Sequence, residues 1–166
     1  MLAALTTPAQ LLGYLAFVFG VACFLQHDDR RFKIFMALEC LSYALHFALL
    51  DKPTAVAGSL VGLARSLVAL RTHSPWAAAG FVALSVALGA WWADGWVSLL
   101  PIVSSVLGTS ALFLLRALTM RLVMLVGTLL WVLHNLLVGS IGGTLLELVV
   151  AGANLWTISR LWRRPV

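Results

Sequence analysis

Polar residues inside long apolar stretches are the places in this sequence where chemistry could occur. Such residues are costly in a bilayer and therefore suggest function. They are Glu39, His46, Arg65, His134, Asn135, Glu147 and Asn154. Their side chains could exchange protons through carboxyl and imidazole groups, or bind a polar solute through guanidinium and amide groups. No spacing typical of a hydrolase or a zinc site occurs, so we expect no enzyme, no metal and no cofactor.

The two histidines in these apolar stretches also mark an internal repeat. His46 in CLSYALHFALL and His134 in TLLWVLHNLLV are 88 residues apart. The same offset joins other like residues, namely Gly20 with Gly108, Lys33 with Arg121 and, after one inserted residue, Arg71 with Arg160. Matches of leucine with leucine carry little weight in so apolar a chain. The histidines, glycines and basic positions therefore carry the prediction of a duplicated bundle.

Composition predicts that this bundle lies in a membrane. Hydrophobic residues make up 62% of the chain and charged residues only 10%, and the mean hydropathy is +1.02. Spanning the hydrocarbon core takes ~20 apolar residues. Stretches of about that length occur at 8–26, 32–50, 55–70, 76–92, 99–115, 120–138 and 141–161. The sequence thus predicts an all-α membrane protein with seven transmembrane helices in a single domain, residues 1–166.

Basic residues predict the orientation, because they gather in short cytoplasmic loops. Those near the odd-numbered helix exits are Arg30, Arg31, Lys33, Arg71, Arg116, Arg121, Arg160, Arg163 and Arg164, whereas the even-numbered exits have only Lys52. We therefore expect the N-terminus outside and the C-terminus in the cytoplasm. The same bias explains the net charge of +5. Anionic lipid headgroups are the expected partners of this face, and nucleic acid is not.

The repeat and the orientation together predict a 3+1+3 arrangement. Residues 8–71 and 99–161 are two three-helix repeats, and residues 76–92 are the linker helix between them. The two repeats are parallel in the membrane, as in SWEET-type transporters, which bind solute near the midplane. The linker helix has tryptophans at its two ends that fit interfacial belts, namely Trp76, Trp91, Trp92 and Trp96.

Several motifs in this order resemble a known family. HDDRRFK, RSLVALRTHS, LTMR, WVLHN and GSIGGTLLE are similar to the YgjV-like family of bacterial inner-membrane proteins, over almost the whole chain. That family resembles SWEET and PQ-loop transporters, which implies a multi-pass inner-membrane protein that carries a small solute. The chain departs from the wider pattern because it has no Pro-Gln pair. Its prolines lie at predicted helix ends or in loops, so no hinge at a proline kink is expected: Pro8, Pro53, Pro75, Pro101 and Pro165.

The predicted solute site centres on two opposite charges. Glu39 lies ~10 Å from the cytoplasmic end of its helix at ~1.5 Å per residue, and Arg65 lies at nearly the same depth. We expect an ion pair, which either serves a solute or only holds two helices together. In a solute path Glu39 would hold Arg65 in place or exchange a proton. In the second repeat these positions are Gly127 and Asn154. The resemblance to SWEET transporters, with asparagines on helices three and seven, implies that Asn154 contacts solute, and Arg65 would favour an anion.

His46 and His134 are expected at one depth in the outer half of the bilayer. They could hydrogen-bond packed helices, act as a proton-sensitive gate or coupling site, or together bind haem or a metal. Glu147 could be a solvated residue at the pathway mouth or a gating acid that faces them.

The predicted function is transport of a small polar solute by alternating access between the two repeats. One alternative is a membrane scaffold or accessory protein without a pathway, and another is a haem protein with two histidine ligands. The sequence leaves open whether the protein forms a homo-oligomer.

Overall fold

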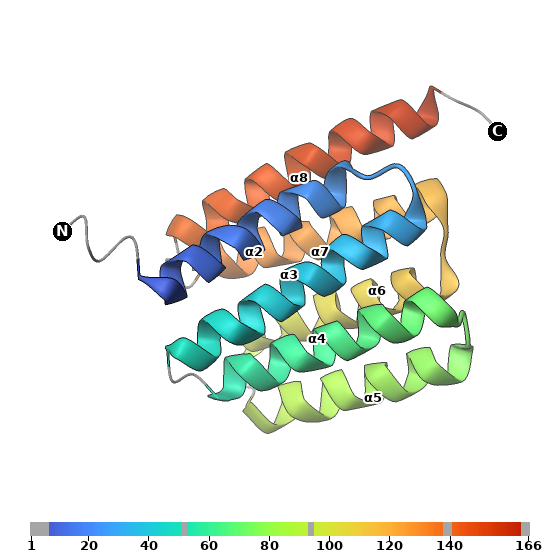
Figure 1. Cartoon of the computed structure of the whole chain (residues 1–166). Helices are drawn as coiled ribbons and strands as arrows, with labels where there is room; N and C mark the ends of the chain where they lie inside the picture. Colours follow the sequence, from blue (N-terminus) through green and yellow to red (C-terminus); the bar gives the residue numbers. More distant parts are fainter. Residues whose placement is uncertain (1–6, 51–52, 93–94, 138–140, 164–166) are drawn as a thin grey trace. The chain divides into compact units, whose positions relative to one another are not determined.

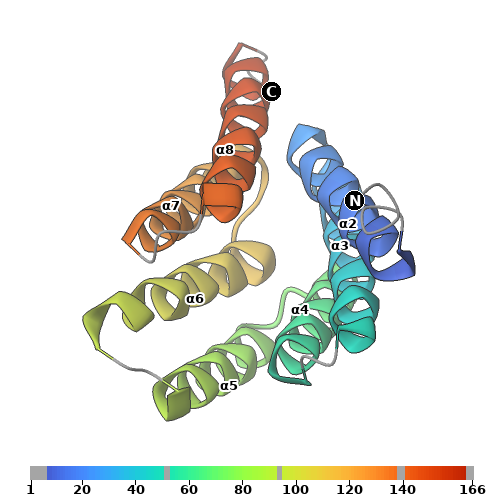
Figure 2. The ribbon, with the colours of Figure 1, turned by 90° about the vertical axis from the view of Figure 1, so that its left-hand side faces the viewer.

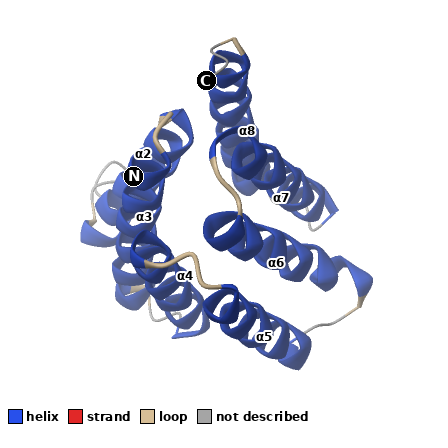
Figure 3. Ribbon diagram, turned by 90° about the vertical axis from the view of Figure 1, so that its right-hand side faces the viewer, coloured by secondary structure: helices blue, strands red, loops and turns tan. Residues whose placement is uncertain are grey.

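The computed structural model describes residues 7–50, 53–92, 95–137 and 141–163, and within these ranges it contains helices and no strands (Figure 3). In these described ranges the chain runs through seven α-helices (Figure 1). They are α2 (Pro8–Leu25), α3 (Asp29–Leu49), α4 (Pro53–Arg71), α5 (Pro75–Trp92), α6 (Leu99–Leu114), α7 (Ala117–Leu137) and α8 (Ile141–Trp162), with a short 3-10 helix η1 (Trp96–Ser98) before α6. The predicted all-helical fold with seven helices is confirmed.

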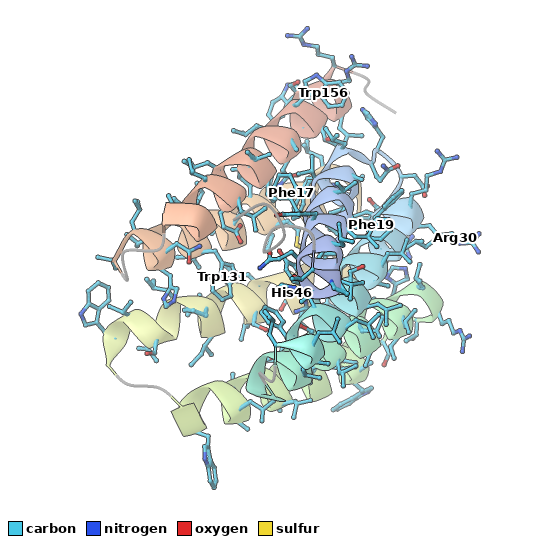
Figure 4. The ribbon with its side chains drawn as sticks, turned by 60° about the vertical axis from the view of Figure 1, so that its left-hand side comes forward. Phe17, Phe19, Arg30, His46, Trp131 and Trp156 are labelled. Atoms are coloured by element: carbon cyan, nitrogen blue, oxygen red, sulfur yellow. The ribbon has the colours of Figure 1, made fainter. Side chains whose placement is uncertain are left out.

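Helix α3 begins earlier than its apolar stretch does. The Asp28 side chain accepts a hydrogen bond of 2.8 Å from Arg31 N, which caps the helix and lets it start at Asp29. Arg30 therefore belongs to the first turn of α3, and its side chain points away from the helices (Figure 4). Helix α7 also begins before its predicted start, and its first residue, Ala117, has a φ of 46°.

The chain forms two compact units, Met1–Arg71 and Thr72–Val166. In the first unit α3 packs against both α2 and α4. In the second unit α5, α6, α7 and α8 pack successively, each against the next (Figure 2). The helix expected as a linker, α5, thus packs on α6 and belongs to the second unit.

Within the described part of the chain, four helical segments are long and apolar enough to cross a membrane: Pro8–Leu25, Asp29–Leu49, Trp96–Leu114 and Ala117–Leu137. That all seven predicted helices cross it stays a prediction. Pro75–Trp91 is a shorter apolar helix. Large apolar side chains of these segments, among them Leu11, Val18 and Leu136, are exposed on the helix surfaces. Exposed leucine and valine suit contact with lipid tails, which are as apolar as they are.

Tryptophan side chains at the ends of α5 and before α6 are strongly exposed. Trp76 is 85% exposed and Trp91 is 84% exposed, and Trp96 is also exposed. This placement is typical of residues that anchor a protein at membrane interfaces.

Other residues used in the sequence predictions lie outside the described part, namely Lys52, Arg164 and Pro165 and the side chains of Pro53 and Trp92. The 3+1+3 arrangement and the placement of the termini stay predictions.

Candidate polar sites in the two helical units

The first site lies where Glu39 of α3 packs against α2. A Cβ atom added to Gly20 would lie 3.0 Å from Glu39 Oε1. Because glycine has no side chain, the carboxylate reaches the backbone of α2 at this position. Gly20 is buried, and the Glu39 side chain is half-buried. The sequence therefore places an acidic group within a helix–helix contact, where water is scarce.

Arg65 of α4 brings a positive charge to the same level. It is half-buried and close enough to Glu39 and Cys40 to interact electrostatically with both. Helices α3 and α4 approach closely here, because a Cβ atom added to Gly62 would lie 2.9 Å from Cys40 Sγ. Opposite charges attract strongly in a medium of low dielectric constant, which offsets part of the cost of desolvating them. The first unit thus brings Glu39 and Arg65 together.

The corresponding level of the second unit is uncharged at both positions. Gly127, the counterpart of Glu39, packs against α6, and its carbonyl oxygen accepts a 3.0 Å hydrogen bond from Ser104 Oγ. Asn154, the counterpart of Arg65, is fully buried, and its Nδ2 donates to the Arg121 carbonyl oxygen at 3.0 Å. Asn154 Oδ1 is buried without a hydrogen-bond partner among the described residues.

The two histidines make the same contact in their respective units. His46 Nδ1 lies 2.6 Å from the Ala9 carbonyl oxygen, and His134 Nδ1 lies 3.2 Å from the Val97 carbonyl oxygen. Ala9 and Val97 are themselves 88 residues apart. A carbonyl oxygen only accepts hydrogen bonds, so Nδ1 is inferred to carry the proton in both rings. Nε2 of each neutral ring then keeps a lone pair that can accept a proton.

Aromatic side chains surround both imidazoles. The His46 ring is 5.0 Å from the Phe47 ring and 6.4 Å from the Tyr43 ring, measured between centroids. The His134 ring is 5.5 Å from the ring of Trp131, which lies on α7 (Figure 4).

Comparison with known proteins places the chain in a family. A family model described as "Bacterial inner membrane protein" (Imp-YgjV) matches residues 7–165. The chain belongs to this family. It is 39% identical over 158 residues to "Inner membrane protein YgjV" of Escherichia coli (strain K12), an alignment that covers 93% of this chain and 85% of that protein. No solved structure matches the chain. Membership confirms the predicted family and indicates a bacterial inner-membrane protein, while the likeness to SWEET and PQ-loop transporters stays a prediction.

Glu147 of this YgjV-family chain lies in the N-terminal part of α8. The side chain is half-buried, and within the described ranges it makes no hydrogen bond to either histidine. The described residues thus show no hydrogen bond that would support a role for Glu147 as a gating acid beside His134. Its proposed role at the mouth of a pathway stays a prediction.

Two buried cations were not among the residues predicted to form the site. Lys33 is 4% exposed, and its Nζ donates a 2.9 Å hydrogen bond to the Ala69 carbonyl oxygen in the last turn of α4. Its counterpart Arg121 is 0% exposed. Both residues were expected among the loop charges, although both lie inside the predicted helices 32–50 and 120–138. A basic residue at the matching place inside a predicted helix of each repeat is the sequence feature that indicates that these cations are buried.

Proposed function

We propose that this protein carries a small polar solute across the bacterial inner membrane. The observation that supports it best is that the half-buried Glu39 and Arg65 are close enough to interact electrostatically inside the first unit. Replacing a buried ion pair by apolar residues is often neutral or stabilising, so packing alone does not require one. Charged residues within membrane helices commonly mark a path for solutes or ions.

Within the first unit Arg65, and separately within the second unit Asn154, are the groups proposed to contact solute. The guanidinium of Arg65 has donors arranged in a planar fork that matches a carboxylate, which favours a solute carrying an anionic group. Asn154 has a buried Oδ1 atom without a partner in the described part of the chain, and an N–H or O–H group of a solute would satisfy it. Glu39 holds Arg65 in place when no solute is bound.

The division into two compact units also supports transport. Alternating access requires bodies that move while keeping their internal packing. Each unit has its own helix contacts and its own histidine-to-carbonyl hydrogen bond. The units would therefore keep their structure during such a movement.

The test is a solute screen on the purified protein followed by flux measurements in proteoliposomes. The panel contains monocarboxylates, dicarboxylates, amino acids and neutral sugars. We expect an anionic class to raise the unfolding temperature and to move across the membrane, and Arg65→Gln to abolish both effects. Arg71→Gln is the matched control, because Arg71 is an exposed arginine at the end of the same helix.

Absence of flux for every solute with folded wild-type protein would contradict the proposal. It would favour the scaffold alternative, in which changes at Arg65 and Glu39 lower expression and assembly instead.

A further inference from the structure

The surroundings of Glu39 contain few other groups that could neutralise it. Helix α2 has no acidic, basic or histidine residue, and its titratable side chains are Tyr14 and Cys23. Cys23 Sγ donates a 3.1 Å hydrogen bond to the Phe32 carbonyl oxygen. The residue of α2 that meets the Glu39 carboxylate is Gly20. The α2 side of the contact therefore provides no charge.

The neighbours on α3 and α4 leave Arg65 as the principal counter-charge. On α3, Lys33 and His46 lie about two turns away on either side, and each hydrogen-bonds a backbone carbonyl oxygen. Cys40, next to Glu39, is a thiol that also interacts with Arg65. The other basic residue of α4, Arg71, is exposed at the end of that helix.

We infer that the Glu39–Arg65 pair couples the binding of an anion to the uptake of one proton, so that the site is electrically neutral both empty and loaded. This inference rests on the proposed function. In the empty site the carboxylate and the guanidinium balance each other. An anionic solute that binds Arg65 takes the guanidinium from Glu39 and adds one negative charge.

Neutrality then returns when a Glu39 carboxylate oxygen takes a proton from water. Arginine keeps its proton throughout, because it is not deprotonated in proteins. The carboxylate is the group that changes, since burial of a carboxylate without a partner strongly favours its protonated form. Solute and proton enter and leave together, and no net charge crosses the low-dielectric region.

The second unit cannot repeat this exchange. Its counterparts of Glu39 and Arg65 are Gly127 and Asn154, which carry no charge at any physiological pH. The coupling is therefore confined to the first unit, at one proton for each anion.

The first experiment needs no solute. Arg65→Gln removes the guanidinium, as a bound anion would, and infrared spectra at neutral pH report whether Glu39 is protonated. We expect an additional carboxylic acid C=O stretching band in the difference spectrum of Arg65→Gln minus wild type, and none in that of Arg71→Gln minus wild type. The band should disappear in the double variant Arg65→Gln/Glu39→Gln and persist in Arg65→Gln/Glu147→Gln. A folded Arg65→Gln protein without the band would overturn the inference.

The second experiment measures protons taken up when an anion binds. Each monocarboxylate and dicarboxylate of the panel, with L-lactate first, is added to the protein in weakly buffered solution with a pH indicator. We expect about one proton per bound anion in the wild type and none in Glu39→Gln, with His134→Gln unchanged from the wild type. Anion binding or flux without proton uptake would refute the coupling and leave the proposed function standing. Absence of binding by every anion would instead refute the anionic solute, while the infrared result still decides how Glu39 responds to loss of Arg65.

Discussion

The hydrogen bond from His134 to Val97 compensates for a proline in the next helix. Val97 lies in the 3-10 helix η1, where the Leu99 N–H also points to its carbonyl oxygen; in a regular α-helix this oxygen would instead accept from the N–H of residue 101. Residue 101 is proline, which has no N–H. His134 Nδ1, 3.2 Å from that oxygen, supplies a donor from α7. The first unit differs, because the counterpart of Pro101 is Gly13, whose N–H is available to the Ala9 carbonyl oxygen.

This arrangement predicts that His134 and Pro101 are energetically coupled. His134→Ala removes the side-chain donor to the half-buried Val97 carbonyl oxygen, which costs about 0.5–1.5 kcal/mol, and it also loses packing against Trp131. Pro101→Ala restores a backbone N–H at the right place. In that background His134→Ala should cost about 1 kcal/mol less, which is the net value of one hydrogen bond.

The assay is a double-mutant cycle on the purified protein, with unfolding by sodium dodecyl sulfate in mixed micelles followed by circular dichroism. The packing loss is common to both backgrounds and cancels, so the difference isolates the hydrogen bond. Additivity of the two changes to within about 0.3–0.5 kcal/mol would refute the reasoning. His46→Ala is the comparison in the first unit. There the Gly13 N–H can still donate to the Ala9 carbonyl oxygen, so the loss of stability from the missing hydrogen bond should be smaller.

Two further predictions use the same unfolding assay. Gly20→Ala should destabilise the protein by about 1–2 kcal/mol and reduce solute binding, because the new methyl group displaces the Glu39 carboxylate at 3.0 Å. Gly152→Ala on α8 is its control, since no atom lies within 4 Å of the added Cβ, and we expect about 0.5–1 kcal/mol of stabilisation. Equal effects of the two changes would contradict the close packing of Glu39. Lys33→Met should cost about 1.5–3 kcal/mol through loss of the charged donor to the Ala69 carbonyl oxygen. Lys33→Arg keeps a positively charged donor at this position and should lose less stability than Lys33→Met, and an equal loss would argue against that hydrogen bond.

The helices could be predicted because their apolar stretches are long and their breaks are polar. The errors lie where a helix continues beyond its apolar part. Asp29, Arg30 and Arg31 are charged and were assigned to a loop, yet the Asp28 cap starts α3 before them. Hydropathy cannot detect such a turn, because it measures transfer into lipid and not backbone hydrogen bonding.

The site could be predicted only in part. The rise per residue was enough to place Glu39 and Arg65 at one depth, and the structure brings them together. The rise per residue could not identify Gly20 as the contact of Glu39, because that contact depends on how α2 and α3 pack. The acceptors of the histidines, Ala9 and Val97, are backbone carbonyl oxygens, which every residue has and no motif reveals.

The differences between the two repeats help to separate structural from functional residues. The histidine-to-carbonyl contact is present in both units, and Nδ1 donates whether the imidazole is neutral or protonated, so protonation would not break it. A contact kept twice and insensitive to pH suits helix packing. The charged pair exists once, where Glu39 meets Arg65, and Gly127 and Asn154 show that the fold forms without it. Because the fold does not demand those charges, selection for function is the simpler explanation of their presence in the first unit.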